Sequence, residues 1–175
     1  MLAELTVQNL IIVEKALLHP GEGLVVSHLL DEAMVVALPS GHGLMRGKPA
    51  ASAPLPLKAL AAESFVFFRR PEGPGLTDLI VAACRAAGFT PRVGQEAPRP
   101  ASALNFVAAG HGISIVPASM QRMHLDGVSY RRLAGAAQLK APLNLVSRRG
   151  EPSPVVRQFL NLVRRNAKGL SAAGV

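Results

Sequence analysis

Residues 65–112 read FVFFRRPEGPGLTDLIVAACRAAGFTPRVGQEAPRPASALNFVAAGHG and decide the fold that we expect for this chain of 175 residues. Strand-like and helical segments alternate along this stretch and just beyond it, at 65–68, 76–87, 92–96, 102–109 and 113–116. Strands separated by single helices are typical of parallel βαβαβ units with right-handed crossovers. The stretch therefore predicts an α/β lobe.

Both helical segments carry start and stop signals. The first has apolar residues at the i, i+3, i+4, i+7 spacing of a helix lying on a sheet, namely Leu76, Leu79, Ile80, Ala83, Cys84 and Ala87. Pro74 stands where a helix start tolerates proline, and Gly88 stands where the helix should end. Ser102 is the expected N-cap of the second helix, and Gly110 is its expected stop.

The flanking segments supply the remaining elements. Separate strands are expected at 24–28, 32–39, 128–130 and 143–147. The continuous apolar run 34–38 is typical of a strand buried on both faces. A final helix should begin at Ser153-Pro154 and hold Arg164 and Arg165 in its last turn, where they would suit the helix dipole.

The net charge of +8 is unevenly distributed along the chain. Residues 1–63 carry six acids and four bases, a net of −2, whereas residues 64–175 carry five acids and fifteen bases, a net of +10. Such an excess can indicate nucleic-acid binding, but the simpler interpretation is that scattered arginines solvate a surface. No basic stripe is interleaved with aromatic residues, as a platform for single-stranded nucleic acid would require.

The cysteine content and the N-terminal segment suggest a compartment. Cys84 is the only cysteine, which excludes an internal disulfide and a cysteine-based zinc cluster. The N-terminus lacks a basic start, and charged residues border its apolar run at 10–13. We therefore expect no signal peptide and no membrane span, and we expect a soluble protein of the cytoplasm.

Three loops, at 69–75, 97–101 and 117–119, follow strands of the predicted lobe. Ligands of open parallel sheets collect at the carboxyl ends of the strands, where helix N-termini offer free N–H groups to anions. The first loop adds two guanidinium groups, Arg69 and Arg70. This arrangement would accept a small anion, with a carboxylate as the expected group. The alternative is that both arginines are solvated surface residues.

Other kinds of site are poorly supported. The Gly73-Pro74-Gly75 turn lacks the lysine and hydroxyl of a phosphate-binding loop, and Gly110-His111-Gly112 is typical of a tight helix-to-strand turn. Cys84 falls on the apolar stripe, which indicates a core residue rather than a nucleophile. The histidines show no paired ligand spacing; they are His19, His28, His42, His111 and His124. We expect no catalytic residue, no metal and no cofactor.

An ordered set of motifs over residues 24–166 resembles the effector-binding domain of LysR-type transcriptional regulators. The motifs are EAMVVALPSGH at 32–42, FVFFRRP at 65–71, GPGLTD at 73–78, AAGF at 86–89, QEA at 95–97, VAAGHGISIVP at 107–117, and Ser153-Pro154 followed by Phe159-Leu160. No single motif is diagnostic, but their order is that of the family. The pattern is most similar to the branch that senses intermediates of aromatic catabolism.

The resemblance implies a fold like that of type II periplasmic binding proteins, with two α/β lobes joined by two crossing strands and the effector between them. Residues 55–140 would form the second lobe, 1–54 and 141–170 an incomplete first lobe, and 171–175 a disordered tail. Family effector contacts would fall on Phe68 to Pro71 and on Val116-Pro117. Together with the loops described above, the expected effector site comprises Phe68, Arg69, Arg70, Pro71, Gly73, Gly75, Ala97, Val116 and Pro117.

The resemblance also implies a function and partners. The chain would be a sensing domain without enzyme activity that binds a small anionic metabolite, pairs as a homodimer and makes no membrane contact. It would reach DNA only through a helix-turn-helix that these residues do not include, and the start of the split lobe is also missing from them. The alternatives are a stand-alone solute-binding protein of the same fold, an enzyme that uses the cleft, and a degenerate fragment.

Overall fold

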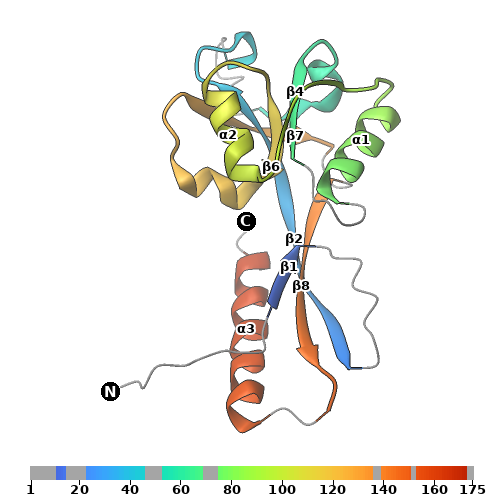
Figure 1. The fold of residues 1–175 in the computed structure, drawn as a ribbon, viewed down its shortest axis with the longest axis vertical. Helices are drawn as coiled ribbons and strands as arrows, with labels where there is room; N and C mark the ends of the chain where they lie inside the picture. Colours follow the sequence, from blue (N-terminus) through green and yellow to red (C-terminus); the bar gives the residue numbers. More distant parts are fainter. Residues whose placement is uncertain are drawn as a thin grey trace. The chain divides into compact units, whose positions relative to one another are not determined.

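The computed structural model describes residues 11–14, 23–45, 53–68, 75–135, 139–150 and 153–172, and it describes only the backbone of 11–14 and 168–172. Its helices and strands are drawn in Figure 1. The chain divides into two compact units, which are residues 1–31 with 142–175 (unit 1) and residues 32–141 (unit 2). The sequence predicts lobe boundaries after residues 54 and 140, and those boundaries stay a prediction.

The central layer of unit 2 has the βαβαβ order that the sequence predicts. Its elements are β4 (Ser64–Phe68), α1 (Leu76–Ala86), β5 (Arg92–Ala97), α2 (Pro100–Ala108) and β6 (Ser114–Pro117). Strands β4 and β5 are parallel, and Phe65 forms a parallel bridge with Ile113, just before β6. Helices α1 and α2 lie on opposite sides of these strands (Figure 1). The expected parallel arrangement is therefore confirmed.

One extra residue in β5 shifts the register of this layer. Phe65 pairs with Val93, but the next residue of β4, Val66, pairs with Gln95, so that Gly94 is a bulge. A Cβ at Gly94 would lie 3.1 Å from the Cβ of Ser64, which explains why glycine occupies the bulge. The shift places Ala97 opposite Phe68 at the carboxyl end of the pair.

The long strand β2 (Leu24–Pro39) corrects the expectation of two separate strands at 24–28 and 32–39. In unit 2 it pairs antiparallel with β6 and with β7 (Val128–Ala134). The short strand β3 (Leu55–Pro56) adds a parallel pair to β7. Three 3-10 turns connect the described elements of this unit; they are Gly43–Met45, Leu57–Leu60 and Ala118–Met123.

The ends of α1 and α2 show which local signals decided the helices. Gly88 and Gly110 have positive φ values of 89° and 79°, so both predicted stops are confirmed. Each ends its helix with the paired hydrogen bonds of a Schellman motif. The predicted N-cap Ser102 is wrong, because α2 begins two residues earlier with Pro100 at its first position and Arg99 as N-cap.

The core of unit 2 is aliphatic with a small aromatic group. The predicted stripe of α1 is buried at Leu76, Ile80 and Cys84. Phe65 stacks on Phe67 at 5.5 Å between ring centroids. The other fully buried large side chains of this unit include Met34, Leu38, Leu60, Leu104, Ile113 and Ile115. Burial of such side chains supplies most of the free energy that holds the layers together.

Unit 1 combines strands with the long helix α3 (Pro154–Ala172). Strand β1 (Ile11–Glu14) pairs antiparallel with β8 (Lys140–Arg148), which neighbours β2. Figure 1 shows α3 running beside β1 and β8. The helix includes Ser171 and Ala172, so the expected disordered tail from 171 begins too early; residues 173–175 lie outside the described residues. Arg164 and Arg165 are consequently not in its last turn.

Candidate functional site

Five residues of the predicted effector site lie at the carboxyl ends of strands or at a helix start of unit 2. Phe68 ends β4, Ala97 ends β5, and Val116-Pro117 ends β6. Gly75 is the N-cap of α1. Phe68 and Ala97 are direct partners in the parallel ladder. The remaining predicted residues, Arg69, Arg70, Pro71 and Gly73, lie outside the described residues.

The strand-end side chains at this edge are part of the core rather than of the surface. Phe68 is 7% exposed, Ala97 is 3% exposed and Val116 is fully buried. These apolar side chains therefore hold the ends of the strands in place and offer no polar group at this edge.

The start of α1 already has its own acidic partner. The Asp78 carboxylate accepts the Gly75 N–H at 2.7 Å, which is one half of a capping box; glycine has no side chain to supply the other half. A carboxylate in the first turn also compensates the positive end of the helix dipole. The sequence-based expectation of free N–H groups for an anion is thus only partly met here. The Gly-x-x-Asp spacing at 75–78 was the signal for this cap.

The loop after β6 shows the same feature. The backbone N–H of Ser119 donates a short hydrogen bond to the carboxylate of Glu32, a residue of β2. Because 87 positions separate the two residues, no local pattern of the sequence could have indicated this contact. Two carboxylates, Asp78 and Glu32, therefore engage backbone donors at this edge of unit 2.

The hydroxyl of Thr77 ties α1 to the end of β4. It donates a 2.6 Å hydrogen bond to the carbonyl oxygen of Phe68. The bond joins the first turn of α1 to the last described residue before Arg69 and Arg70. Thr77 belongs to the GPGLTD motif but was not among the predicted site residues.

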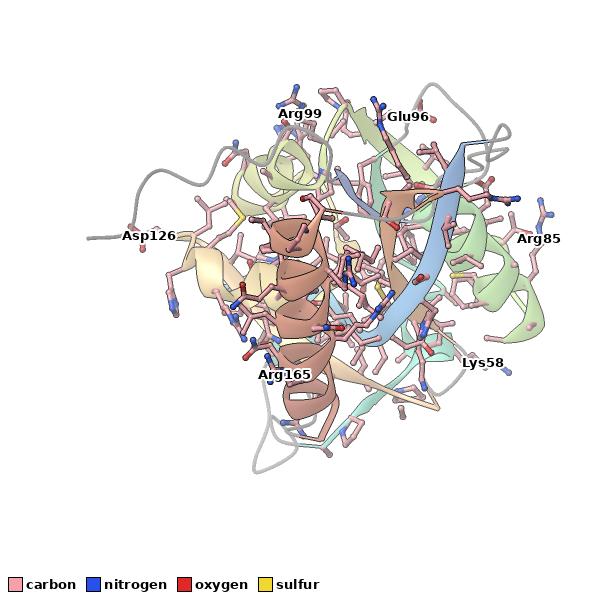
Figure 2. All side chains as sticks on the ribbon, turned by 90° about the horizontal axis from the view of Figure 1, so that it is seen from below. Lys58, Arg85, Glu96, Arg99, Asp126 and Arg165 are labelled. Atoms are coloured by element: carbon pink, nitrogen blue, oxygen red, sulfur yellow. The ribbon has the colours of Figure 1, made fainter. Side chains whose placement is uncertain are left out.

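Arg99 is a cation at the same edge, within the predicted loop 97–101 but not among the predicted site residues. It follows Ala97 by two residues and is the N-cap of α2. Figure 2 shows its side chain pointing outward from the molecule. A guanidinium at this place adds positive charge close to the end of β5 in the chain.

A polar cavity of about 260 Å³ lies at the opposite, amino end of the parallel strands, lined in part by Ser64, Arg92 and Gly112. His42 and Glu63 also line it, with 3.2 Å between Nε2 and the carboxylate. Since the Leu44 N–H donates to His42 Nδ1, Nε2 is the nitrogen that carries the proton and donates to Glu63. The hydrogen bond between His42 and Glu63 stabilises the loop after β2.

A second cavity of about 370 Å³ lies beside the end of α1. Ala83, Ala86 and Ala87 form one wall, and residues around β3 and β7 form the other. Lys58 is its ionisable lining residue. Neither cavity includes a residue of the predicted effector site.

Catalytic and metal chemistry find little support in the described ranges. Burial raises the pKa of the Cys84 thiol from 9.0 to about 11, so the side chain stays protonated and is a poor nucleophile. Among the described residues no group of three His, Cys, Asp or Glu side chains could hold a metal ion. No helix within those ranges is long and apolar enough to cross a membrane.

A family model described as the LysR substrate binding domain matches residues 8–168. The chain belongs to this family. The regulator CatR of Pseudomonas putida is 32% identical over 140 residues, which are 80% of this chain and 46% of CatR. The chain spans about half the length of the curated relatives that it matches. These relatives are transcriptional regulators of the helix-turn-helix type and not enzymes.

Solved LysR proteins share the fold. Full-length CbnR in complex with its target DNA has a TM-score of 0.77 and 25% identity, over 91% of this chain and 53% of that one. The effector-binding domain of BenM with benzoate also has a TM-score of 0.77, with 22% identity over 95% of this chain and 72% of that one. This LysR substrate-binding chain thus has the expected type II periplasmic-binding-protein fold.

Proposed function

We propose that this chain senses a small carboxylate effector at the carboxyl edge of unit 2, as the effector-binding part of a LysR-type transcriptional regulator. The observation that carries this proposal is the register of β4 and β5, which sets Phe68 beside Ala97. Because of that pairing, the loops that follow both strands leave the sheet at the same edge. One loop contains Arg69 and Arg70, and the other contains Arg99.

Arginines rather than the backbone provide the preference for an anion. Asp78 and Glu32 already engage backbone donors at this edge. A neutral ligand would leave the guanidinium groups without a counter-charge, whereas a carboxylate can accept two parallel N–H bonds from one guanidinium. An aromatic acid is the ligand class that we propose to test first, since the BenM domain of the same fold was solved with benzoate.

The proposed role extends to the parent regulator. The sensing chain would pair as a homodimer, and a helix-turn-helix outside these residues would read the operator sequence. Effector binding would then alter the way in which the paired chains present DNA-binding elements. A regulator that acts on chromosomal DNA works in the cytoplasm, so we propose that location.

Thermal unfolding and calorimetric titration with benzoate test the proposal, with benzamide as the uncharged control. A ligand at one hundred times its Kd should stabilise the chain by about 2.7 kcal/mol. We expect benzoate, or another aromatic acid of a small set, to raise the melting temperature, and benzamide to leave it unchanged. The variant Arg69→Ala should lose this response, whereas Arg85→Ala on α1 should keep it.

Two results would contradict the proposed function. A folded chain that no carboxylic acid stabilises would not be a carboxylate sensor. An unchanged response in Arg69→Ala and in Arg99→Ala would place the ligand away from this edge.

A further inference from the structure

Helix α3 carries an acid-free set of arginines on its exposed side. Pro154–Ala172 contains four basic residues and no Asp or Glu. The side chains of Arg157, Arg164 and Arg165 are exposed, and Figure 2 labels Arg165 on the helix surface. Arg157 and Arg164 are seven residues apart, about two turns, which places them roughly 10 Å apart along one face.

The helix itself does not account for Arg164 and Arg165. Because α3 continues to Ala172, both lie about two turns before its end, whereas the helix dipole acts mainly within the last turn. The ion pairs of the described residues, His28–Asp31 and His42–Glu63, do not involve them. Among the described ion pairs Arg164 and Arg165 thus have no acidic partner, and two adjacent exposed guanidinium groups suit an external polyanion.

The apolar face of α3 limits the choice of polyanion. Leu160 and Ala167 are each 6% exposed, so this face is packed within unit 1. A helix that lies on a membrane surface needs its apolar face free to enter the lipid. The exposed Val155 and Leu162 lie on the side of α3 away from Leu160, and two apolar side chains make only a small apolar area there. A partner that binds through charge alone fits the helix better than a lipid surface does.

We propose that Arg164 and Arg165 contact the phosphate backbone of double-stranded DNA, with Arg157 extending the contact along α3. Duplex DNA is the polyanion present in the CbnR complex, a structure that shares this fold. Phosphate contacts carry no sequence information and act by positioning the protein and adding affinity. The contact thus adds a second, sequence-independent route to DNA beside the expected helix-turn-helix, and it does not depend on an effector.

Fluorescence anisotropy with a labelled duplex of arbitrary sequence tests this contact between about 25 and 200 mM salt, conditions chosen because phosphate contacts respond strongly there. Each phosphate contact contributes about 0.9 to the slope of log Kd against log salt. The double variant Arg164→Gln/Arg165→Gln should therefore lower the slope by about 1.8. The matched control Arg85→Gln/Arg122→Gln removes the same charge from exposed positions of unit 2 and should leave the slope unchanged. Circular dichroism melts of both variants establish that they fold.

Three outcomes would overturn the proposal. Equal losses in the two double variants would show that binding reflects only the net charge of the chain. If the chain does not bind the duplex at about 25 mM salt, where phosphate contacts are strong, α3 is not a DNA contact. The same conclusion follows if the α3 variant binds as the wild type does. If polyglutamate, or vesicles made of phosphatidylglycerol, bind through Arg164 and Arg165 as tightly as DNA does, the partner is not DNA. If the double variant fails to fold, each single variant should lower the slope by about 0.9.

Discussion

The side chain of Thr77 and the backbone of Phe68 are joined by a 2.6 Å hydrogen bond across the two ends of the segment that contains Arg69 and Arg70. The bond fixes the first turn of α1 against the last residue of β4. Arg69 and Arg70 lie in the chain between these two fixed points, which limits the conformations open to the residues between them. The pair therefore couples the stability of unit 2 to the affinity of the proposed site.

Thr77→Val removes the hydroxyl and keeps the shape of the side chain. We expect a loss of about 1 kcal/mol in the free energy of unfolding, as for one intramolecular hydrogen bond. The Kd for the carboxylate that stabilises the wild-type chain should rise at the same time. Urea denaturation and calorimetric titration measure the two effects. Thr77→Ser keeps the donor and is the control; a Val variant that behaves like Ser would show that the bond is unimportant.

Gly112 and Gly110 offer a matched pair of substitutions in one turn. Gly112 has φ of 140°, and a Cβ there would lie 2.5 Å from the carbonyl oxygen of Ser64. Gly110 has φ of 79°, and a Cβ there would meet nothing within 4 Å beyond its chain neighbours. Gly110→Ala should therefore cost only the left-handed strain of roughly 1–2 kcal/mol. Gly112→Ala should cost more than about 3 kcal/mol, because backbone atoms must also move. Equal midpoints in urea would contradict this difference.

Arg131 is a buried cation that connects two separate loops. Its guanidinium donates to the carbonyl oxygens of Leu44 and Ala53, at 2.7 and 2.6 Å. Arg131→Met would leave both oxygens without this donor, and we expect a loss on the order of 2–4 kcal/mol in the free energy of unfolding. The neighbouring exposed Arg132 provides the control, since Arg132→Met should change stability by less than about 0.5 kcal/mol. Similar losses in both variants would argue against a specific role for Arg131.

The Cys84 thiol should make the free energy of unfolding depend on pH in the alkaline range. Burial raises the pKa of its thiol to about 11, whereas the unfolded value is 9.0. The unfolded chain therefore loses the proton first, so this thiol lowers stability as pH rises from 9.0 to about 11. Burial also raises the pKa of Tyr130, which acts in the same direction at higher pH. Comparison of melting curves across this pH range for the wild type and Cys84→Ala isolates the thiol. If the wild type and Cys84→Ala lose the same stability over this pH range, the prediction is wrong.

Local signals predicted the parts of the fold that depend on near neighbours. The apolar spacing of Leu76, Ile80 and Cys84 defined the buried face of α1, because helix geometry alone brings these positions together. Gly88 and Gly110 marked helix ends, since a left-handed backbone favours glycine. At α2, proline at the first helical position outweighed the capping tendency of Ser102.

The errors arose where tertiary partners override a local pattern. The sequence predicted strands at 24–28 and 32–39 with a break at 29–31, but a strand exposed on one side tolerates a charged residue such as Asp31, and Glu32 accepts the Ser119 N–H. That donor lies 87 positions away and leaves no mark in the nearby sequence. The role of Asp78 was local and could have been recognised from its distance to Gly75. The placement of Phe68 and Ala97 at one edge followed from parallel topology, whereas their pairing depended on the bulge.

The bulge at Gly94 shifts the register of β5 by one position before its carboxyl end. If Gly94 paired with Val66 in a regular ladder, Glu96 would stand opposite Phe68 and bring a carboxylate to the strand end that we propose for an anion. Because Gly94 is bulged out of the ladder instead, the neutral Ala97 takes that place. The electrostatic character of the rim therefore depends on whether position 94 is bulged or paired, as well as on which residues β5 contains. A deletion at position 94 would remove the bulge and keep Ala97 at the rim, whereas a residue that paired at position 94 would bring Glu96 there.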